Sequence, residues 1–186
     1  MNQKGPNFRW YVEIIWWLIP AFLISTAVCW SHQRNVIWQD EIRFWMDCIK
    51  KSPNKARPYN NAGAIFMKMG RLGMAVSFVA KSVELDPNSL ESQNNYGILL
   101  GEAGKYQEAI DHLKISEKLL AKLHANPEDD TRFSQVYNNM GLYLAALGRF
   151  DEAVVEFKRA IQYNAGLSLA QDNLKRLQDR MSKWRK

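Results

Sequence analysis

The sequence predicts an all-α protein in which a single transmembrane helix near the N-terminus is followed by a short α-solenoid of helical hairpins. Eighteen consecutive residues without a charge, from Ile14 to Ser31, predict the transmembrane helix. Three later segments share one pattern of glycine, alanine and apolar residues at helical spacing, which predicts the hairpins. Proline is scarce, with 6 in 186 residues, and this suits helices better than a sheet with many turns.

The composition narrows the class of protein. Hydrophobic residues make up 47% of the chain, so a real core can form. The net charge of +6 is modest, and much of the excess lies at the C-terminal end, in Lys175, Arg176, Arg180, Lys183, Arg185 and Lys186. Without a recognition motif this cluster indicates a solvated helix end, and no nucleic-acid partner is expected. The two cysteines, Cys29 and Cys48, form no CxxC pair.

Residues 1–12 are expected to be a short tail, and residues 13–31 a transmembrane anchor in a lipid bilayer. A helix of eighteen residues rises roughly 27 Å, close to the thickness of the hydrocarbon core. Tryptophan prefers the membrane interface and proline is tolerated in spanning helices. The residues assigned to the anchor are therefore Trp10, Trp16, Trp17, Pro20 and Trp30.

Other interpretations of this segment stay open. Lys4 and Arg9 could begin a signal peptide that is cleaved after Ala27, so removal of residues 1–27 is not decided. A lipoprotein cysteine at Cys29 and a buried core helix are weaker alternatives. Basic residues flank the segment on both sides, so the positive-inside rule does not fix its orientation.

Three segments carry the repeated pattern, namely residues 58–87, 92–120 and 136–164. Gly97 follows Gly63 by 34 residues, whereas Gly141 follows Gly97 by 44. About ten residues are therefore inserted between the second and third segments, and they lengthen the second helix of the middle hairpin. Each segment is expected to form two amphipathic helices joined by a short turn.

Matching positions in the three segments have matching structural roles. A glycine in the first helix allows the second helix to approach closely, and a later glycine ends the first helix in a left-handed conformation. Small and apolar residues fill the crossing between the helices. These sets are Gly63, Gly97 and Gly141; Gly70, Gly104 and Gly148; Ala75, Ala109 and Ala153; and Val79, Leu113 and Phe157.

Three aligned copies of NNxG…G…EA, or its variant, resemble the tetratricopeptide repeat (TPR) family over about residues 37 to 186. The first copy departs from the pattern with Met74 in place of glutamate, and the second lacks the final proline. The expected parts are a capping half repeat at 34–55, repeats at 56–89, 90–133 and 134–167, and a capping helix at 168–186. The capping helix carries an apolar stripe of Ala170, Leu174, Leu177, Met181 and Trp184.

A second resemblance concerns the junction after the apolar segment. The run RNxxWxDExxxWxDxxxKSPxKARxxNN, from Arg34, is similar to the junction between the last span and the repeats in polytopic membrane mannosyltransferases that carry TPRs. This resemblance implies repeats outside the cytoplasm, here on a bacterial inner membrane. The catalytic multi-span part is not found in this sequence, so the resemblance transfers topology and not activity.

No motif for catalysis, a cofactor or a metal is found. His32, His112 and His124 lie on different predicted elements without ligand spacing. The segment from Gly101 to Tyr106 lacks the length and the hydroxyl residue of a phosphate loop. The acidic run 128–130 lacks the alternation of a calcium loop. We therefore expect a protein that is not an enzyme.

The first helices of the hairpins are expected to line a concave groove that binds a protein or peptide segment. Asparagine pairs recur there, and a carboxamide can pair with the backbone of an extended peptide. In the alternative, the second asparagine of each pair bonds a neighbouring helix. The expected groove residues are Asn60, Asn61, Asn94, Asn95, Asn138, Asn139, Arg57, Lys68, Ile98 and Leu142.

Two functions follow from these expectations. The first is a membrane-anchored adaptor or scaffold, or a small accessory subunit packed against other membrane subunits. The second is a substrate-recognition accessory of a membrane glycosyltransferase, which depends on the junction resemblance alone.

Overall fold

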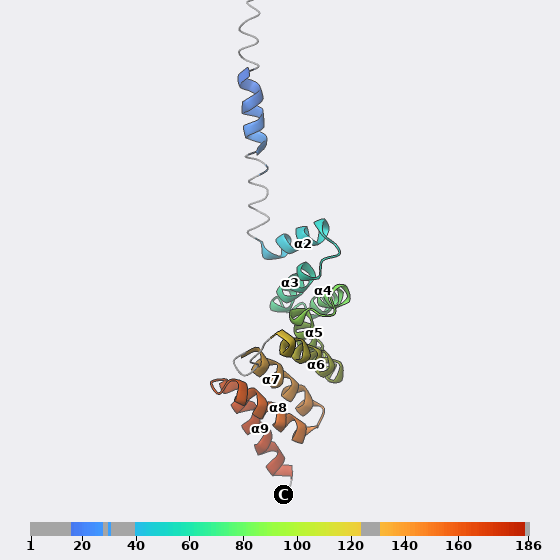
Figure 1. Ribbon diagram of the computed structural model, residues 1–186, viewed down its shortest axis with the longest axis vertical. Coiled ribbons are helices and arrows are strands. Elements are labelled where there is room, and N and C mark those ends of the chain that lie inside the picture. Colours follow the sequence, from blue (N-terminus) through green and yellow to red (C-terminus); the bar gives the residue numbers. More distant parts are fainter. Residues whose placement is uncertain (1–15, 28–29, 31–39, 124–130, 185–186) are drawn as a thin grey trace, which may run out of the picture. The chain divides into compact units, whose positions relative to one another are not determined.

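The computed structural model describes residues 16–27, 30, 40–123 and 131–184, and the regular structure in these ranges is helical (Figure 1). The chain divides into two units, residues 1–44 and residues 45–186. From residue 41 onward the described helices are α2 (Glu41–Lys51), α3 (Ala56–Lys68), α4 (Leu72–Leu85), α5 (Leu90–Glu102), α6 (Tyr106–Leu123), α7 (Thr131–Ala146), α8 (Phe150–Tyr163) and α9 (Ser168–Trp184).

In the N-terminal unit, residues 16–27 are helical. Among the described residues, no helix combines the length and the apolar character that crossing a membrane requires. The transmembrane helix expected over residues 13–31 is therefore wrong, and so is the single-pass membrane localisation that depended on it.

The residues assigned to the anchor are placed only in part. Trp16, Trp17, Pro20 and Trp30 are exposed, with 78% of Trp17 accessible to solvent. Trp10 lies outside the described residues, as do the rest of segment 1–15 and residues 28–29 and 31–39.

Helix α2 begins at a capping aspartate. Asp40 accepts hydrogen bonds from the backbone N–H groups of Ile42 (3.2 Å) and Arg43 (3.4 Å), which otherwise lack partners at a helix N-terminus. None of the residues of α2 is buried. The expectation that this helix caps the solenoid therefore remains a prediction.

The C-terminal unit is built from consecutive helical hairpins. Helices α3 and α4, α5 and α6, and α7 and α8 pack together as pairs, and each second helix also contacts the first helix of the next pair (Figure 1). We call α3, α5 and α7 the A helices and α4, α6 and α8 the B helices. The A helices also contact one another in order along the stack, and α9 packs against α8 and α7. The A helices thus form one continuous side of the unit.

The turn inside each hairpin follows one design. Gly70, Gly104 and Gly148 have φ values of 71°, 79° and 77°, the left-handed region that glycine adopts without a steric penalty. After α3, the N–H of Gly70 donates to Met67 (2.9 Å), and the next residue closes a second bond to Phe66. The expected role of these three glycines is confirmed.

The interior of each hairpin consists of small residues at the helix crossing and larger residues between hairpins. Ala75, Ala109 and Ala153 are fully buried, as are Val79 and Leu113. At the third crossing, a Cβ at Gly141 would lie 2.7 Å from Cε1 of Phe157, so a larger residue would force the helices apart. These expectations are confirmed as well.

The repeat is irregular between the second and third hairpins. Helix α6 has 18 residues, whereas α4 and α8 each have 14. The remainder of the insertion, residues 124–130, lies outside the described residues.

Candidate functional site

Side chains at matching positions on α3, α5 and α7 form a row that we call the A face. Arg57, Glu91 and Gln135 occupy one position, and they are all exposed. Ala64, Ile98 and Leu142 occupy the next. Lys68, Glu102 and Ala146 occupy a third.

The A face is nearly neutral with an apolar centre. Its cations Arg57 and Lys68 are offset by the carboxylates of Glu91 and Glu102. Leu142 keeps 39% of its side chain exposed although it is apolar. A surface of this kind suits an uncharged or apolar partner better than a strongly acidic one.

Three of the expected asparagines form hydrogen bonds inside the stack. Asn60 and Asn138 are buried, with 4% and 3% exposed. The Oδ1 atom of Asn60 accepts from Nδ2 of Asn95 on the next A helix (2.9 Å), and Oδ1 of Asn138 accepts from Nδ2 of Asn173 on α9 (3.0 Å). The first asparagine of one hairpin is thus bonded to the second asparagine position of the next.

This amide ladder is broken at one step. Oδ1 of Asn94, the first asparagine of the second hairpin, is buried and has no hydrogen-bond partner within the described protein. The matching donor is Asn139, which follows Asn94 by 45 residues, whereas Asn95 follows Asn60 by 35. Both Asn139 and Asn61 are half-buried. The insertion before α7 therefore coincides with the missing bond.

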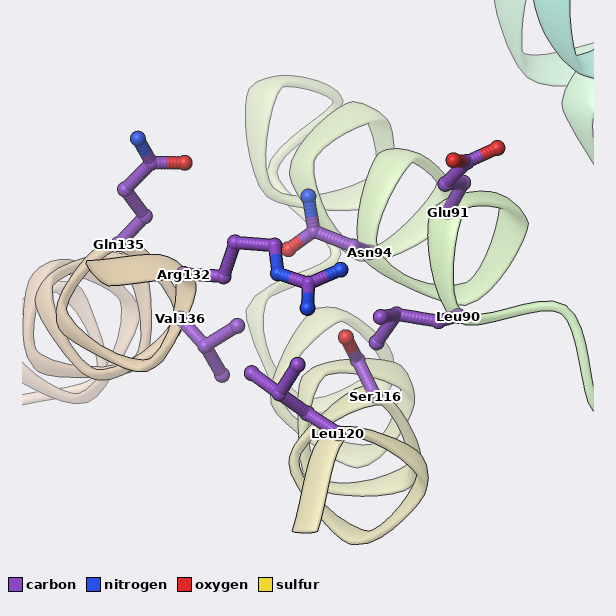
Figure 2. Close-up of a pocket in the computed structure, with 8 residues that line it drawn as sticks. All are labelled: Leu90, Glu91, Asn94, Ser116, Leu120, Arg132, Gln135 and Val136. Carbon is purple, nitrogen blue, oxygen red and sulfur yellow. The ribbon is translucent and has the colours of Figure 1, made fainter. Parts of the chain in front are cut away.

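A pocket of about 140 Å³ lies at the same step, between α5, α6 and α7 (Figure 2). Its apolar wall consists of Leu90, Leu120 and Val136. The Arg132 side chain reaches from α7 toward the side chains of α5 (Figure 2). The full lining is Leu90, Glu91, Asn94, Ser116, Leu120, Arg132, Gln135 and Val136.

Ser116 supplies a second unmatched polar atom in this pocket. It is fully buried, and its Oγ has no hydrogen-bond partner within the described protein. In the first hairpin the matching residue, Ser82, donates to the carbonyl of Ala56 (2.9 Å) and lies 2.8 Å from the hydroxyl of Ser92. The position of Ser92 is occupied by Val136 in the third hairpin, so Ser116 has lost its hydroxyl neighbour.

This pocket was not predicted from the sequence, although its lining residue Asn94 belongs to the expected groove residues. The sequence does contain a sign of the unmatched hydroxyl. Ser82 and Ser116 are 34 residues apart and occupy matching positions, whereas the residue that matches Ser92, 44 positions later, is the apolar Val136. Only the hydrogen bonds of the first step show that this change leaves a hydroxyl unmatched.

A polar cluster supports the middle hairpin behind the A face. Gln93 donates through Nε2 to the carbonyl of Pro87 (2.7 Å), and its Oε1 lies 2.6 Å from Nδ1 of His112. Burial lowers the pKa of His112 below 6.5, although Asp111 and Glu108 oppose the shift. Because Gln93 offers a carbonyl oxygen, a neutral His112 would donate from Nδ1. The cluster holds α5 against α6.

Two tyrosines hold the third hairpin in the same way. The hydroxyl of Tyr137 donates to Glu117 (2.8 Å), and burial together with this carboxylate raises the pKa of Tyr137. The hydroxyl of Tyr143 donates to the carbonyl of Ile98 (3.3 Å), and burial raises the pKa of Tyr143 to about 12. Both phenols remain protonated at neutral pH and act as hydrogen-bond donors.

Within the described residues, no group of three or more His, Cys, Asp or Glu side chains is placed to hold a metal ion. His32, His124 and the acidic run 128–130 lie outside the described residues. Gly101 belongs to α5, and Gly104 has the left-handed conformation of a hairpin turn. The described side chains of the A face and the pocket can offer a ligand hydrogen bonds and apolar contacts.

Family models of the tetratricopeptide repeat match three stretches of the chain. The matched residues are 56–89, 79–111 and 134–167. The first and third stretches coincide with hairpins α3–α4 and α7–α8, and the second runs from α4 into α6.

Two relatives illustrate the similarity among characterised proteins. The chain is 33% identical over 89 residues to Protein O-mannosyl-transferase Tmtc3 of Drosophila melanogaster, a match that covers 48% of this chain and 10% of that protein. It is 26% identical over 74 residues to Hsp70-Hsp90 organizing protein 3 of Arabidopsis thaliana, covering 40% of this chain and 13% of that protein. The chain thus spans only a small part of these relatives.

Solved structures show the same fold at low sequence identity. The first TPR domain of Spaghetti (RPAP3), bound to the HSP90 peptide SRMEEVD, matches with a TM-score of 0.60 at 18% identity, covering 69% of this chain and 94% of that one. The pilF protein of Pseudomonas aeruginosa matches with a TM-score of 0.66 at 19% identity, covering 82% and 64%. Tetratricopeptide repeats are therefore present at three stretches of this chain, which also resembles a protein O-mannosyl-transferase over 48% of its length.

Proposed function

We propose that this protein is a non-catalytic interaction module that binds an extended peptide segment of a partner protein along the A face. The observation that carries the proposal is the apolar row on neighbouring A helices, where Ile98 is half-exposed and Leu142 is 39% exposed. Apolar side chains that remain accessible to solvent and are surrounded by polar residues are typical of a binding surface.

The amide groups have a smaller part in this proposal than the asparagine pairs suggest. Asn60 and Asn138 are buried and their Oδ1 atoms accept bonds from Asn95 and Asn173. Contacts to a peptide would come from the half-exposed members of the set, with Arg57 and Lys68 at the edge. The asparagines set the spacing of the A helices that present the apolar row.

The chemistry of the A face also indicates which peptides it would favour. The RPAP3 domain is bound to SRMEEVD, a peptide with two glutamates and an aspartate. Here Glu91 and Glu102 occupy the same positions of the A face as Arg57 and Lys68, so the row offers little net positive charge to such a peptide. We therefore propose a neutral, apolar peptide as the partner segment.

The test uses a phage-displayed library of random heptapeptides selected on the full-length chain. The affinity of selected peptides is then compared for two variants that place a charge on an exposed apolar residue. Leu142→Glu changes the A face, while Val155→Glu changes α8, where the side chain is 49% exposed. Because burying an unpaired carboxylate is costly, Leu142→Glu should weaken binding at least tenfold and Val155→Glu less than twofold.

Equal effects of the two substitutions would place the peptide elsewhere and refute the proposal. A selection dominated by acidic peptides would refute the proposed charge preference.

A second candidate is recognition of protein substrates for a glycosyltransferase. It depends on the 33% identity with Protein O-mannosyl-transferase Tmtc3, of which this chain spans one tenth. Because O-linked mannose is attached to hydroxyl groups, this candidate predicts peptides rich in serine and threonine. The same selection separates it from binding of apolar peptides.

A further inference from the structure

The step between the second and third hairpins differs from the step between the first and second, although the sequence repeats the same asparagine pairs. At the first step, the carboxamide of Asn95 donates to Asn60, and the hydroxyls of Ser82 and Ser92 lie side by side. At the second step, Oδ1 of Asn94 and Oγ of Ser116 have no partner within the described protein. Both residues belong to the lining of the pocket of about 140 Å³.

From this comparison we propose that the pocket is a specificity site for a carboxamide side chain, asparagine or glutamine, presented by the bound peptide. The N–H₂ group would donate to Oδ1 of Asn94, as Asn95 and Asn173 do at the two complete steps. The carbonyl oxygen would accept from the hydroxyl of Ser116. This proposal rests on the proposed function and names the side chain that the A face selects.

Burial and size both support this assignment. Ser116 is fully buried, and an unmatched hydroxyl in such a position loses free energy that a hydrogen bond restores. The side chains of Asn94 and Ser116 approach the same space from different helices (Figure 2). An apolar cavity of about 150 Å³ can bind benzene, so this pocket has room for a side chain of four or five heavy atoms.

The pocket also lies where the partner would pass. Its mouth is bordered by Glu91 and Gln135, two exposed residues that share one position of the A face on neighbouring A helices. The methylene groups of a glutamine side chain would pack against Leu90, Leu120 and Val136, and its amide would reach the two polar atoms. The lining holds one cation, Arg132, and one carboxylate, Glu91, so it offers little net positive charge to a carboxylate, which should bind more weakly than a carboxamide.

The probe is propionamide, which reproduces the end of a glutamine side chain, added to full-length protein with labelled methyl groups. In methyl NMR spectra, Leu90, Leu120 and Val136 should shift and saturate with a dissociation constant on the order of millimolar. Propionate, which carries a charge, and N,N-dimethylpropionamide, which has no N–H donor, should bind at least tenfold more weakly.

The matched variant is Asn94→Leu, which keeps the shape of the side chain and removes the unmatched acceptor. Replacing a buried, unpaired polar group by an apolar one of similar size is close to neutral for folding, so this variant should fold. It should lose at least tenfold in propionamide affinity. Asn54→Leu, at an exposed turn position before α3 and outside the pocket lining, should leave the affinity unchanged.

Three results would overturn the proposal, namely absence of saturable shifts, equal binding of N,N-dimethylpropionamide, and unchanged binding to Asn94→Leu. Absence of shifts would mean that water alone satisfies the two atoms. The peptide selection distinguishes failure of this inference from failure of the proposed function. Selected peptides without an asparagine or glutamine preference would leave the proposed function intact and refute this inference. If propionamide binds but the selection yields no peptide, the proposed function is refuted and the carboxamide specificity of the pocket still holds.

Discussion

Replacing Gly101 by alanine is the sharpest test of how the second and third hairpins pack. Gly101 is buried near the end of α5, and a Cβ built there would overlap the ring of Tyr143 from α7. That ring is held by a hydrogen bond from its hydroxyl to Ile98 (3.3 Å) and by stacking on Tyr106, with centroids 6.1 Å apart. The ring therefore cannot move without losing contacts.

Two opposing effects set the expected magnitude. Alanine in place of glycine inside a helix stabilises by about 1 kcal/mol. Overpacking a filled site costs typically about 1–3 kcal/mol, and the overlap with an aromatic ring places Gly101→Ala at the upper end of that range. The net result should be a loss of about 1–2 kcal/mol in the free energy of unfolding, measured by urea denaturation followed by circular dichroism.

A double-mutant cycle with Tyr143→Ala tests the cause of this loss. Once the ring is removed, Gly101→Ala should become stabilising by up to about 1 kcal/mol, because only the helix preference remains. Gly73→Ala is the matched control, since a Cβ at this position in α4 meets no atom within 4 Å. If Gly101→Ala and Gly73→Ala stabilise the native protein equally, the reasoning about the wedged ring is wrong.

Two further predictions concern the middle hairpin. Burial lowers the pKa of His112 below its ordinary 6.5, so the unfolded chain binds the proton more tightly than the folded protein. The contribution of His112 to stability should therefore be constant above that pH and fall as the pH decreases below it. In a pH series of urea melts, His112→Leu should flatten this decrease, and an unchanged slope would contradict the assignment. Gly104→Ala should cost about 1–2 kcal/mol in the same melts because Gly104 has a φ of 79°, and Gly104→Asn should cost less, since asparagine tolerates the left-handed region.

The sequence was sufficient for the helical hairpins because their determinants are local. A glycine at each turn and a small residue at each crossing are visible as a 34-residue period, and Gly148 and Ala153 behave as that period requires. The prediction at the N-terminus was wrong. Eighteen uncharged residues match a bilayer in length, but no helix among the described residues combines the length and the apolar character of a membrane span.

Contacts between repeats were harder to predict, because equal sequence positions need not have equal neighbours. Gly101 does not belong to the repeated glycine pattern, and its importance appears only when Tyr143 lies against it. Likewise Ser82 and Ser116 match in sequence, but only Ser82 has its hydrogen bonds. The residues that contact these side chains come from other helices, and the insertion before α7 changes which of them are within reach.

The asparagine ladder turns this difference into a measurement with the same substitution at matching positions. Asn95→Ala removes the donor to Oδ1 of Asn60, a residue that is only 4% exposed, and leaving this acceptor unpaired should cost about 1–3 kcal/mol in urea melts. Asn139→Ala removes no bond to Asn94, because that oxygen already has no partner within the described protein, so the cost should stay below about 0.5 kcal/mol. Asn173→Ala, which removes the donor to a buried oxygen at the last step, should resemble Asn95→Ala. Equal losses for Asn95→Ala and Asn139→Ala would mean that the ladder is continuous in solution, and the pocket beside Asn94 would then lose its unmatched acceptor.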